Sequence, residues 1–398
     1  MIVILALTAV LLSPAHAAPG APDGAAKKAL ASGIRAYHSL DLQTALARFD
    51  AAIGAFPGWK TASGFRAACR ATLGDAAGAR EDAALAAKLK PVDAQSFAAR
   101  GKARLTLREY DGALADFHAA EEADASSIEG PLGIGSVLSA QAKTKEALKA
   151  LDDAVRLDPQ SAAALLLRGS VKDRLRDFHG AAEDYNSVLE VNPKYAWAHL
   201  YRGKALRELK DYRGADQELS SFLEATPDHE DAAYLRSNVR FLLGDFRGAV
   251  ADLTKVISLD PRKGLAYTNR GLARAQLGEK AGAISDLRKA LELDPARRDK
   301  IQSAIDSIGT APDADELPAA PPSRRSAALE PPPDGPATVT LEDQGSGVAP
   351  RRPKAPTADL DDSLPTPAKP ASDLPAKRGA HDAPPERNTG EESSQFIQ

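Results

Sequence analysis

The sequence has few of the residues that covalent or metal-based stabilisation requires. Cys69 is the only cysteine, so an intramolecular disulfide is impossible. The histidines are scattered and lack the close spacing of metal ligands. A nucleophile motif and a phosphate-binding loop are also missing. We therefore expect a non-enzymatic protein without metal or other cofactors, held together by side-chain packing.

Long apolar runs are missing as well. The apolar stretch at residues 1–12 is too short to span a bilayer, which takes about twenty residues. Ala15-His16-Ala17 follows it, with the small residues that a signal peptidase accepts. The sequence predicts a signal peptide over residues 1–17, cleaved after Ala17, a periplasmic or secreted protein, and no stable membrane span after cleavage. Because the run lacks a positively charged start, retention of the segment is an alternative.

What the sequence has instead is a period of 34 residues. It runs without insertion or deletion from residue 26 to residue 297. Prolines mark its register, with Ala125 in the one vacant position, at Pro57, Pro91, Pro159, Pro193, Pro227, Pro261 and Pro295. A unit of this length cannot bury a core alone. Each unit must therefore be covered by its neighbour, which predicts a solenoid.

Numbering the places of each repeat from 1 to 34 reveals two columns of small residues. Place 8 is glycine in six repeats, including Gly33 and Gly101, and place 20 is alanine in all eight. Place 24 is mostly large, as in Phe49 and Leu287, so it should fill the space beside the small residues. A glycine-containing turn lies between the small columns, and Leu-Asp-Pro ends many repeats. Each repeat is therefore predicted to be helix, turn, helix.

This pattern resembles the tetratricopeptide repeat family, whose repeat has the same length. The resemblance implies an all-α, right-handed α-solenoid of about eight helix-turn-helix repeats. After a linker at 18–25, the expected repeats are 26–59, 60–93, 94–127, 128–161, 162–195, 196–229, 230–263 and 264–297. Residues 298–309 are expected to form a capping helix, with Ile301 and Ile305 on one face.

Places 7 and 23 vary together. Six repeats pair an arginine with a carboxylate, as in Arg100 and Asp116, whereas repeats one and four have neither partner of the pair. We infer an Arg–carboxylate bridge within a repeat or to the next one, planar and suited to bidentate contact. An anion-binding track of arginines is the alternative. Repeat four also contains Gly130, Gly133 and Gly135, which weaken a helix, so we expect a hinge there.

Residues 310–398 differ in composition from the repeats. They hold 17 of the 28 prolines and fifteen acidic against nine basic residues, which leaves the rest of the chain nearly neutral with 42 basic and 40 acidic residues. A disordered Pro-rich tail is predicted, as a spacer or as a carrier of short docking motifs. Its basic clusters are short and diluted by acid, so nucleic acid is not expected as a partner.

The resemblance also implies where a partner would bind. In the family, places 2, 5, 9, 12 and 13 of the first helices line the concave face. The richest set of such residues here is Leu166, Trp197, Leu200, Lys204, Arg207, Tyr234, Asn238 and Phe241. Aromatic, aliphatic and cationic groups on one strip suit a peptide with apolar anchors and some acid. Packing of these aromatics on the adjacent first helix is the alternative.

The expected function is a protein–protein interaction scaffold or adaptor that binds a peptide segment of a partner in the concave groove. Two alternatives remain at this point. One is a holdase-like chaperone or carrier for exported chains that uses the same groove. The other is a structural component of an envelope or secretion complex, held through the convex face.

Overall fold

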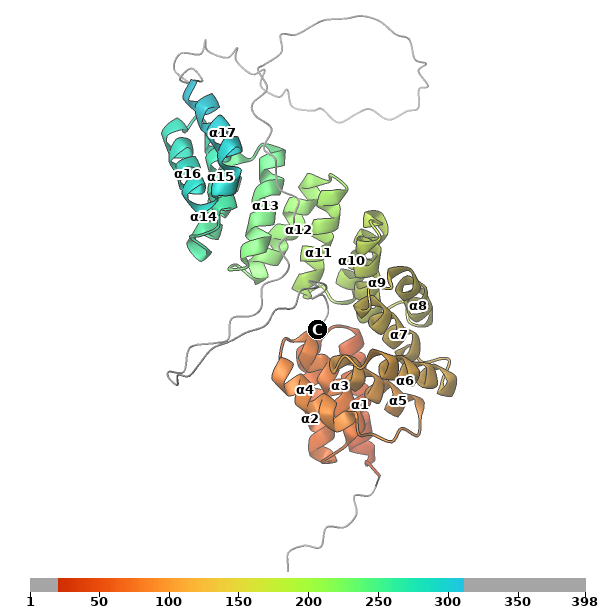
Figure 1. Cartoon of the computed structure of the whole chain (residues 1–398). Coiled ribbons are helices and arrows are strands. Elements are labelled where there is room, and N and C mark those ends of the chain that lie inside the picture. Colours follow the sequence, from red (N-terminus) through yellow and green to blue (C-terminus); the bar gives the residue numbers. More distant parts are fainter. Residues whose placement is uncertain (1–20, 311–398) are drawn as a thin grey trace, which may run out of the picture. The chain divides into compact units, whose positions relative to one another are not determined.

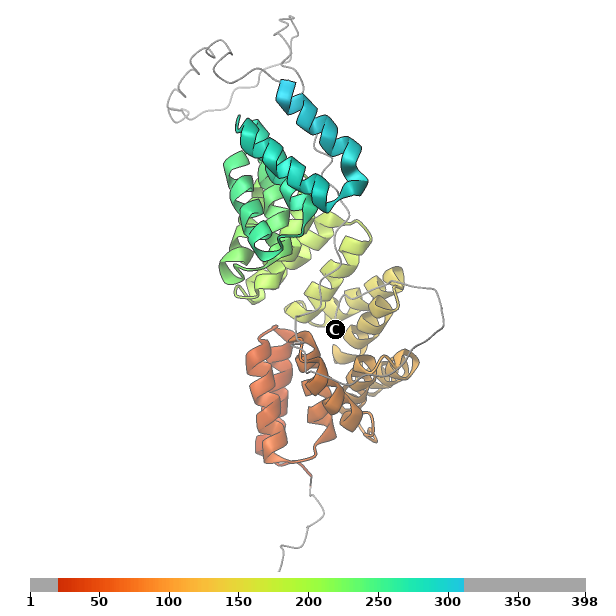
Figure 2. The ribbon, with the colours of Figure 1, turned by 60° about the vertical axis from the view of Figure 1, so that its left-hand side comes forward.

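The fold of residues 21–310, which a computed structural model describes, is all-α. These residues form seventeen α-helices and one short 3-10 helix, without any strand. Successive helices lie antiparallel in pairs, as α1 and α2 do (Figures 1 and 2). The described residues fall into two compact units, 21–210 and 211–310. The predicted signal peptide and the predicted tail lie outside them, apart from residue 310.

The first unit holds eleven helices. They are α1 (Gly24–His38), α2 (Leu42–Ala55), α3 (Lys60–Thr72), α4 (Ala76–Ala86), α5 (Ala94–Thr106), α6 (Tyr110–Ala123), α7 (Glu129–Ala140), α8 (Thr144–Leu157), α9 (Ala162–Arg174), α10 (Phe178–Val191) and α11 (Ala196–Glu208). Odd-numbered helices are the first helices of repeats one to six. Even-numbered helices are the second helices.

The second unit begins with the second helix of repeat six. Its elements are α12 (Tyr212–Ala225), α13 (Glu230–Leu243), α14 (Phe246–Leu259), α15 (Gly264–Gln276), α16 (Lys280–Leu293), the 3-10 turn Pro295–Arg297 and α17 (Arg298–Thr310). Ile301 and Ile308 of α17 are buried against a cluster that includes Leu287 and Ala290 of α16. Helix α17 thus covers the apolar side of the eighth repeat. None of the helices in residues 21–310 is long and apolar enough to cross a membrane.

The two helices of a repeat approach closely where place 8 meets place 24. A Cβ atom added to Gly33 would lie 2.6 Å from the ring of Phe49, and one on Gly101 would lie 2.9 Å from Phe117. The same contact recurs between Gly169 and Tyr185 and at two further repeats. Separations this short leave no room for a methyl group. The predicted pairing of small and large residues is confirmed.

The turn between the two helices takes a left-handed residue at place 15 in every repeat. Three repeats have glycine there, as at Gly74, but the other five have non-glycine residues with φ between 58° and 63°, namely Leu40, Arg108, Ala142, Arg176 and Lys210. An L-residue pays roughly 1–2 kcal/mol for this conformation. The following aspartate often caps the second helix; Asp75, for example, accepts a hydrogen bond from the backbone N–H of Gly78 at 2.9 Å.

Repeat four, where the sequence predicts a hinge, is packed tightly. Its first helix, α7, is buried along most of its length. A Cβ atom on Gly133 would lie 2.1 Å from the ring of Phe117, and one on Gly135 would lie 2.6 Å from Leu151. Because these glycines have no side chain, the ring of Phe117 and the side chain of Leu151 can pack against the backbone of α7. The division between the compact units falls at residues 210 and 211, in repeat six.

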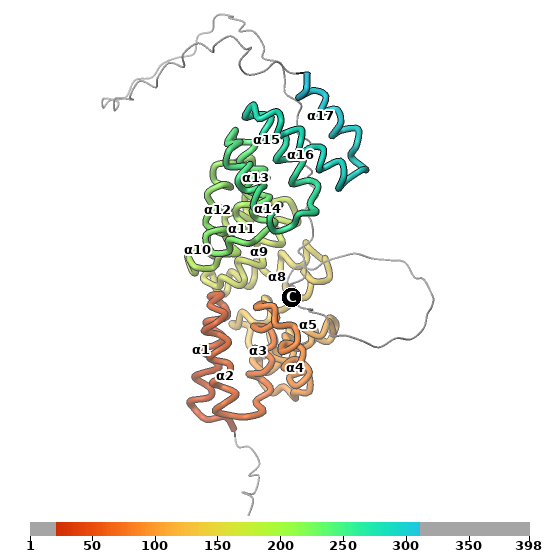
Figure 3. Tube along the Cα trace, turned by 90° about the vertical axis from the view of Figure 1, so that its left-hand side faces the viewer, coloured from red at the N-terminus to blue at the C-terminus, as the bar shows by residue number. Residues whose placement is uncertain are grey.

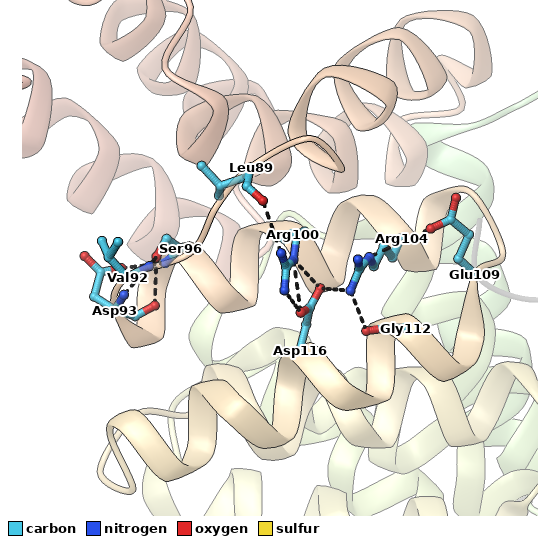
Figure 4. A network of polar contacts seen from close by, with 9 residues as sticks. All are labelled: Leu89, Val92, Asp93, Ser96, Arg100, Arg104, Glu109, Gly112 and Asp116. Carbon is cyan, nitrogen blue, oxygen red and sulfur yellow. Dashed lines mark hydrogen bonds and ion pairs between the residues drawn. The ribbon is translucent and has the colours of Figure 1, made fainter.

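Five of the arginines at place 7 form the predicted bridge, in each case within a repeat. Arg100 donates through Nε and Nη2 to the Asp116 carboxylate, with Nη2 2.6 Å from Oδ1 (Figure 4). Bidentate pairs of this kind also join Arg66 to Asp82, Arg168 to Asp184, Arg236 to Asp252 and Arg270 to Asp286. The carboxylates are buried, while the guanidinium groups are partly exposed.

Two further contacts extend each bridge. A second cation at place 11 binds the other side of the carboxylate, such as Arg104 in repeat three or Lys172 in repeat five, whose Nζ lies 2.9 Å from Asp184 Oδ2. The free Nη1 of the first arginine reaches back to the preceding repeat; that of Arg66 lies 2.7 Å from Asp50. The sequence did not predict these contacts, although the cations at place 11 recur with the same period.

We predict that Ala142→Gly stabilises the fold by about 0.5–1 kcal/mol, because glycine adopts the left-handed conformation without strain. Ala142 is exposed and its methyl group contributes little packing. The same substitution at exposed Ala51, inside α2, should destabilise the fold by about 1 kcal/mol. Urea denaturation followed by circular dichroism measures both effects. Equal shifts in the same direction would contradict the strain argument.

We also predict that the two arginines of repeat three tolerate lysine differently. Arg100→Lys should cost about 1–2 kcal/mol, because lysine cannot reproduce the bidentate fork or the hydrogen bond to the Leu89 carbonyl. Arg104→Lys should cost less than about 0.5 kcal/mol, because Lys172 already serves at this place in repeat five. Thermal denaturation compares them. Similar losses from both variants would show that charge alone matters.

Candidate functional site

The predicted partner-binding residues fall into both compact units. Leu166 lies on α9, and Trp197, Leu200, Lys204 and Arg207 lie on α11, all in the first unit. The other three lie on α13 in the second unit, namely Tyr234, Asn238 and Phe241. We therefore describe the two groups separately.

Trp197 is the most exposed aromatic side chain of the first group, with 42% of its surface accessible. Its indole stacks on Tyr201, one helical turn further along α11, with ring centroids 6.2 Å apart. Tyr201 in turn packs against Tyr185 of α10 at 5.6 Å. Burial raises the pKa of both tyrosines. The stack on half-buried Tyr201 and buried Tyr185 fixes the orientation of Trp197, so its open face is presented in a defined position.

Charged groups lie beyond the aromatic stack on α11. Lys204 Nζ sits 5.9 Å from the centre of the Tyr201 ring. Burial raises the pKa of Asp173 on α9, and the nearby cations of Lys204 and Arg207 oppose this shift. Arg207 forms an ion pair with Glu208. Leu200 is buried, with 3% of its surface exposed, so it belongs to the core.

The predicted residues of the second unit hold α13 against α15. The Asn269 amide of α15 donates to the Tyr234 hydroxyl and to Asn238 Oδ1, both at 3.0 Å. Lys263 Nζ lies 4.9 Å from the Tyr234 ring centre and 2.6 Å from Glu230 Oε1. Tyr234 and Asn238 are thus buried structural contacts between adjacent first helices. Phe241 is partly exposed and packs edge-on against Phe246.

A buried ionic cluster lies among the first helices of repeats one, three and four. The carboxylate of Glu129, at the start of α7, forms two ion pairs. Its Oε1 lies 3.0 Å from His38 Nε2, and its Oε2 lies 3.0 Å from Lys102 Nζ. Lys102 also lies 5.2 Å from the Tyr37 ring centre. Burial alone would raise the pKa of Glu129, but the charges of Lys102 and His38 outweigh it and lower this pKa to about 2. The carboxylate is therefore ionised at neutral pH.

The turn after α1 also reaches repeats five and six. Helix α1 lies beside α9 (Figure 3). Leu40 is buried in a cluster with Leu165 of α9 and Val188 of α10. The Asn192 side-chain amide donates to the Ser39 carbonyl at 3.1 Å. Residues Tyr37–Leu40, which we call the first turn, therefore cover part of the surface formed by α7, α9 and the end of α10.

The sequence missed several of these residues for different reasons. Asp173, Lys102, Glu129 and His38 occupy places that line the concave face in the family, so their position was a usable signal. No feature of the sequence indicated that they would meet across repeats. Tyr201 stands outside those places, and only the structure shows that it supports Trp197. No group of three histidine, cysteine or acidic side chains in residues 21–310 could hold a metal ion.

The helices stack in pairs, and the first helices of successive repeats form a surface. This architecture defines the protein as an α-helical repeat scaffold. Two tetratricopeptide repeat family models match the chain, one at residues 132–172 and 234–298 and the other at 174–239. The chain belongs to the tetratricopeptide repeat family, as its residue pattern suggested. Its fold is that of a protein–protein interaction scaffold, and proteins of this family are in general non-enzymatic. A search of curated proteins gives no match to this sequence.

Solved tetratricopeptide structures resemble parts of the chain. A chain of the APC/C hetero-tetramer Cut9–Hcn1 is 14% identical, with a TM-score of 0.53, over 70% of this chain and 55% of that one. YrrB, a TPR protein with an unusual peptide-binding site, is 20% identical over 47% of this chain and 96% of its own, with a TM-score of 0.45. MamA from Desulfovibrio magneticus RS-1 is 20% identical over 43% and 96%, with a TM-score of 0.41. The first likeness shows a shared fold.

We predict that Glu129→Gln destabilises the protein by about 3 kcal/mol at pH 7, because it leaves the buried Lys102 without a counter-charge. The folded-state pKa of Glu129 is below its ordinary value of 4.5, so its contribution is complete above that pH and is lost as the pH falls towards 2. Urea midpoints of variant and wild type should therefore converge between pH 7 and pH 3.

The exposed carboxylate of Glu146, on α8, provides the control. Glu146→Gln should change the midpoint little at either pH. A difference between Glu129→Gln and wild type that stays constant from pH 7 to pH 3 would contradict the assignment of Glu129 as an ionised, charge-stabilised group.

Proposed function

We propose that the chain is an exported adaptor that binds a peptide segment of a partner protein on the surface of α9 and α11. The partner would place an apolar side chain on Trp197 and an acidic group towards Lys204. The observation that carries this proposal is the 42% exposure of an indole that stacks on half-buried Tyr201, which packs in turn against buried Tyr185.

Physical reasons favour Trp197 as the anchor. Tryptophan, tyrosine and arginine are the side chains that most often carry the binding energy of an interface. A side chain that is already ordered by stacking loses little conformational freedom when a partner binds. Lys204 and Arg207 lie one and two turns further along the helix from Leu200. They therefore place positive charge on the same face of α11, beyond the apolar residues.

In the second unit, taken by itself, the predicted residues differ in their contacts and accessibility. Tyr234 and Asn238 already bind Asn269, so we assign them the role of holding α13 and α15 in register. Phe241 keeps part of its ring accessible at the end of α13.

The apolar stretch at residues 1–12 supports export. The composition of residues 310–398 supports a role for them as a spacer that extends the reach of the adaptor.

The test is capture from envelope extracts by the mature chain, residues 18–398, followed by crosslinking and peptide mapping of the partner. We expect one dominant partner, lost with Trp197→Ala and weakened about tenfold with Lys204→Glu, a change of about 1.4 kcal/mol. Val92→Ala and Lys145→Glu are the controls, because Val92 is 86% exposed in a loop and Lys145 is exposed on the second helix α8.

The other possible outcomes point to different functions. Binding of many unrelated unfolded chains, equally reduced by Trp197→Ala, would identify a holdase-like chaperone or carrier. A dominant partner that survives both Trp197→Ala and Lys204→Glu would place binding on the convex face or on residues 310–398. Either result would overturn the adaptor proposal.

A further inference from the structure

We propose that the surface under the first turn is a docking surface for a partner segment with an imidazole or basic side chain two residues before a leucine. In this structure Tyr37–Leu40 occupies that surface, so the first turn and the partner compete for it. The inference rests on the proposed peptide-binding function and specifies the chemistry of the peptide.

The chemistry follows from the contacts of three consecutive residues. The His38 imidazole binds the carboxylate of Glu129 at 3.0 Å. The Ser39 carbonyl accepts a hydrogen bond from the Asn192 amide at 3.1 Å. Leu40 fills an apolar cluster of Ala162, Leu165, Val188 and Ala198. One charged, one backbone and one apolar contact in sequence are the elements by which a short peptide is recognised.

The covered surface continues into the candidate site. Leu166 packs against the same cluster as Leu40, and it is one of the predicted partner-binding residues. Ala198, buried in that cluster, directly follows the exposed Trp197 on α11. The covered surface and Trp197 thus share helix α11, where Trp197 lies one residue before Ala198.

The surface retains its internal pairing when the first turn leaves. Lys102 binds Oε2 of Glu129, whereas His38 binds Oε1, so removal of His38 leaves the ion pair in place. Water can then solvate the freed oxygen. Leu40 has a φ of 58°, a backbone conformation that favours glycine and that four other repeats also hold with a non-glycine residue at this place.

The test uses the mature chain with Leu40→Gly. Glycine already stands at place 15 in three repeats, so the turn should form while the side chain that fills the cluster is lost. Ala142→Gly, at the same place of repeat four, is the matched control because Ala142 is exposed. The probe is a fluorescein-labelled peptide of residues 34–43, and the measurement is fluorescence anisotropy.

We expect Leu40→Gly to bind this peptide at least tenfold more tightly than wild type and Ala142→Gly do. A peptide carrying both His38→Ala and Leu40→Ala should lose the gain. A folded Leu40→Gly variant, verified by circular dichroism, that binds no more tightly would overturn the inference. So would equal binding of the two peptides.

Partner capture separates this inference from the proposed function. Leu40→Gly should increase capture of the partner identified above, and the peptide should compete with it. Capture that depends on Trp197 but is unchanged by Leu40→Gly would leave the adaptor proposal standing and overturn the competition. A concentration-dependent dimer of Leu40→Gly in sedimentation would identify a second copy as the occupant and would overturn the separate partner.

Discussion

The close approach of the two helices in a repeat is the constraint on which the rest of the structure depends. A glycine at place 8 lets a ring or leucine at place 24 lie almost on the backbone, as Gly169 does for Tyr185. Places 7 and 23 immediately precede these two residues. The same separation of sixteen residues therefore brings Arg168 and Asp184 together, with Nη2 2.7 Å from Oδ1. The ionic bridge is thus a geometric consequence of the apolar contact beside it.

In each bridge, the charge of the arginine is neutralised by its carboxylate partner. Asp116 is buried and binds two cations, Arg100 and Arg104, while the remaining guanidinium donors reach backbone or side-chain acceptors. A satisfied network of this kind favours the structural bridge over an anion-binding track. Positive charge for a partner must then come from cations outside the bridges, such as Lys204 on α11.

Much of the fold could be predicted from the sequence because each repeat is fixed by local, recurring contacts. The pairing of Gly33 with Phe49 and the bridge of Arg66 to Asp82 were both readable from columns of the period. Contacts between distant repeats were not readable. His38 and Glu129 are 91 residues apart, and Asn192 and Ser39 are 153 apart, so their meeting depends on how small rotations accumulate along the stack. For the same reason the sequence could not show that Tyr234 and Asn238 bind Asn269.

The two repeats that lack an arginine–carboxylate bridge supply both partners of a contact that the period does not produce. Repeat one contributes His38 and repeat four contributes Glu129, and Lys102 of repeat three joins them. Regular repeats direct their charges inward to hold their own helices together. In repeats one and four, which lack the arginine–carboxylate pair, His38 and Glu129 instead form an ion pair among the first helices, and Lys102 of repeat three joins it. The departures from the repeat pattern, more than the pattern itself, therefore determine which parts of that surface are covered and which remain open to a partner.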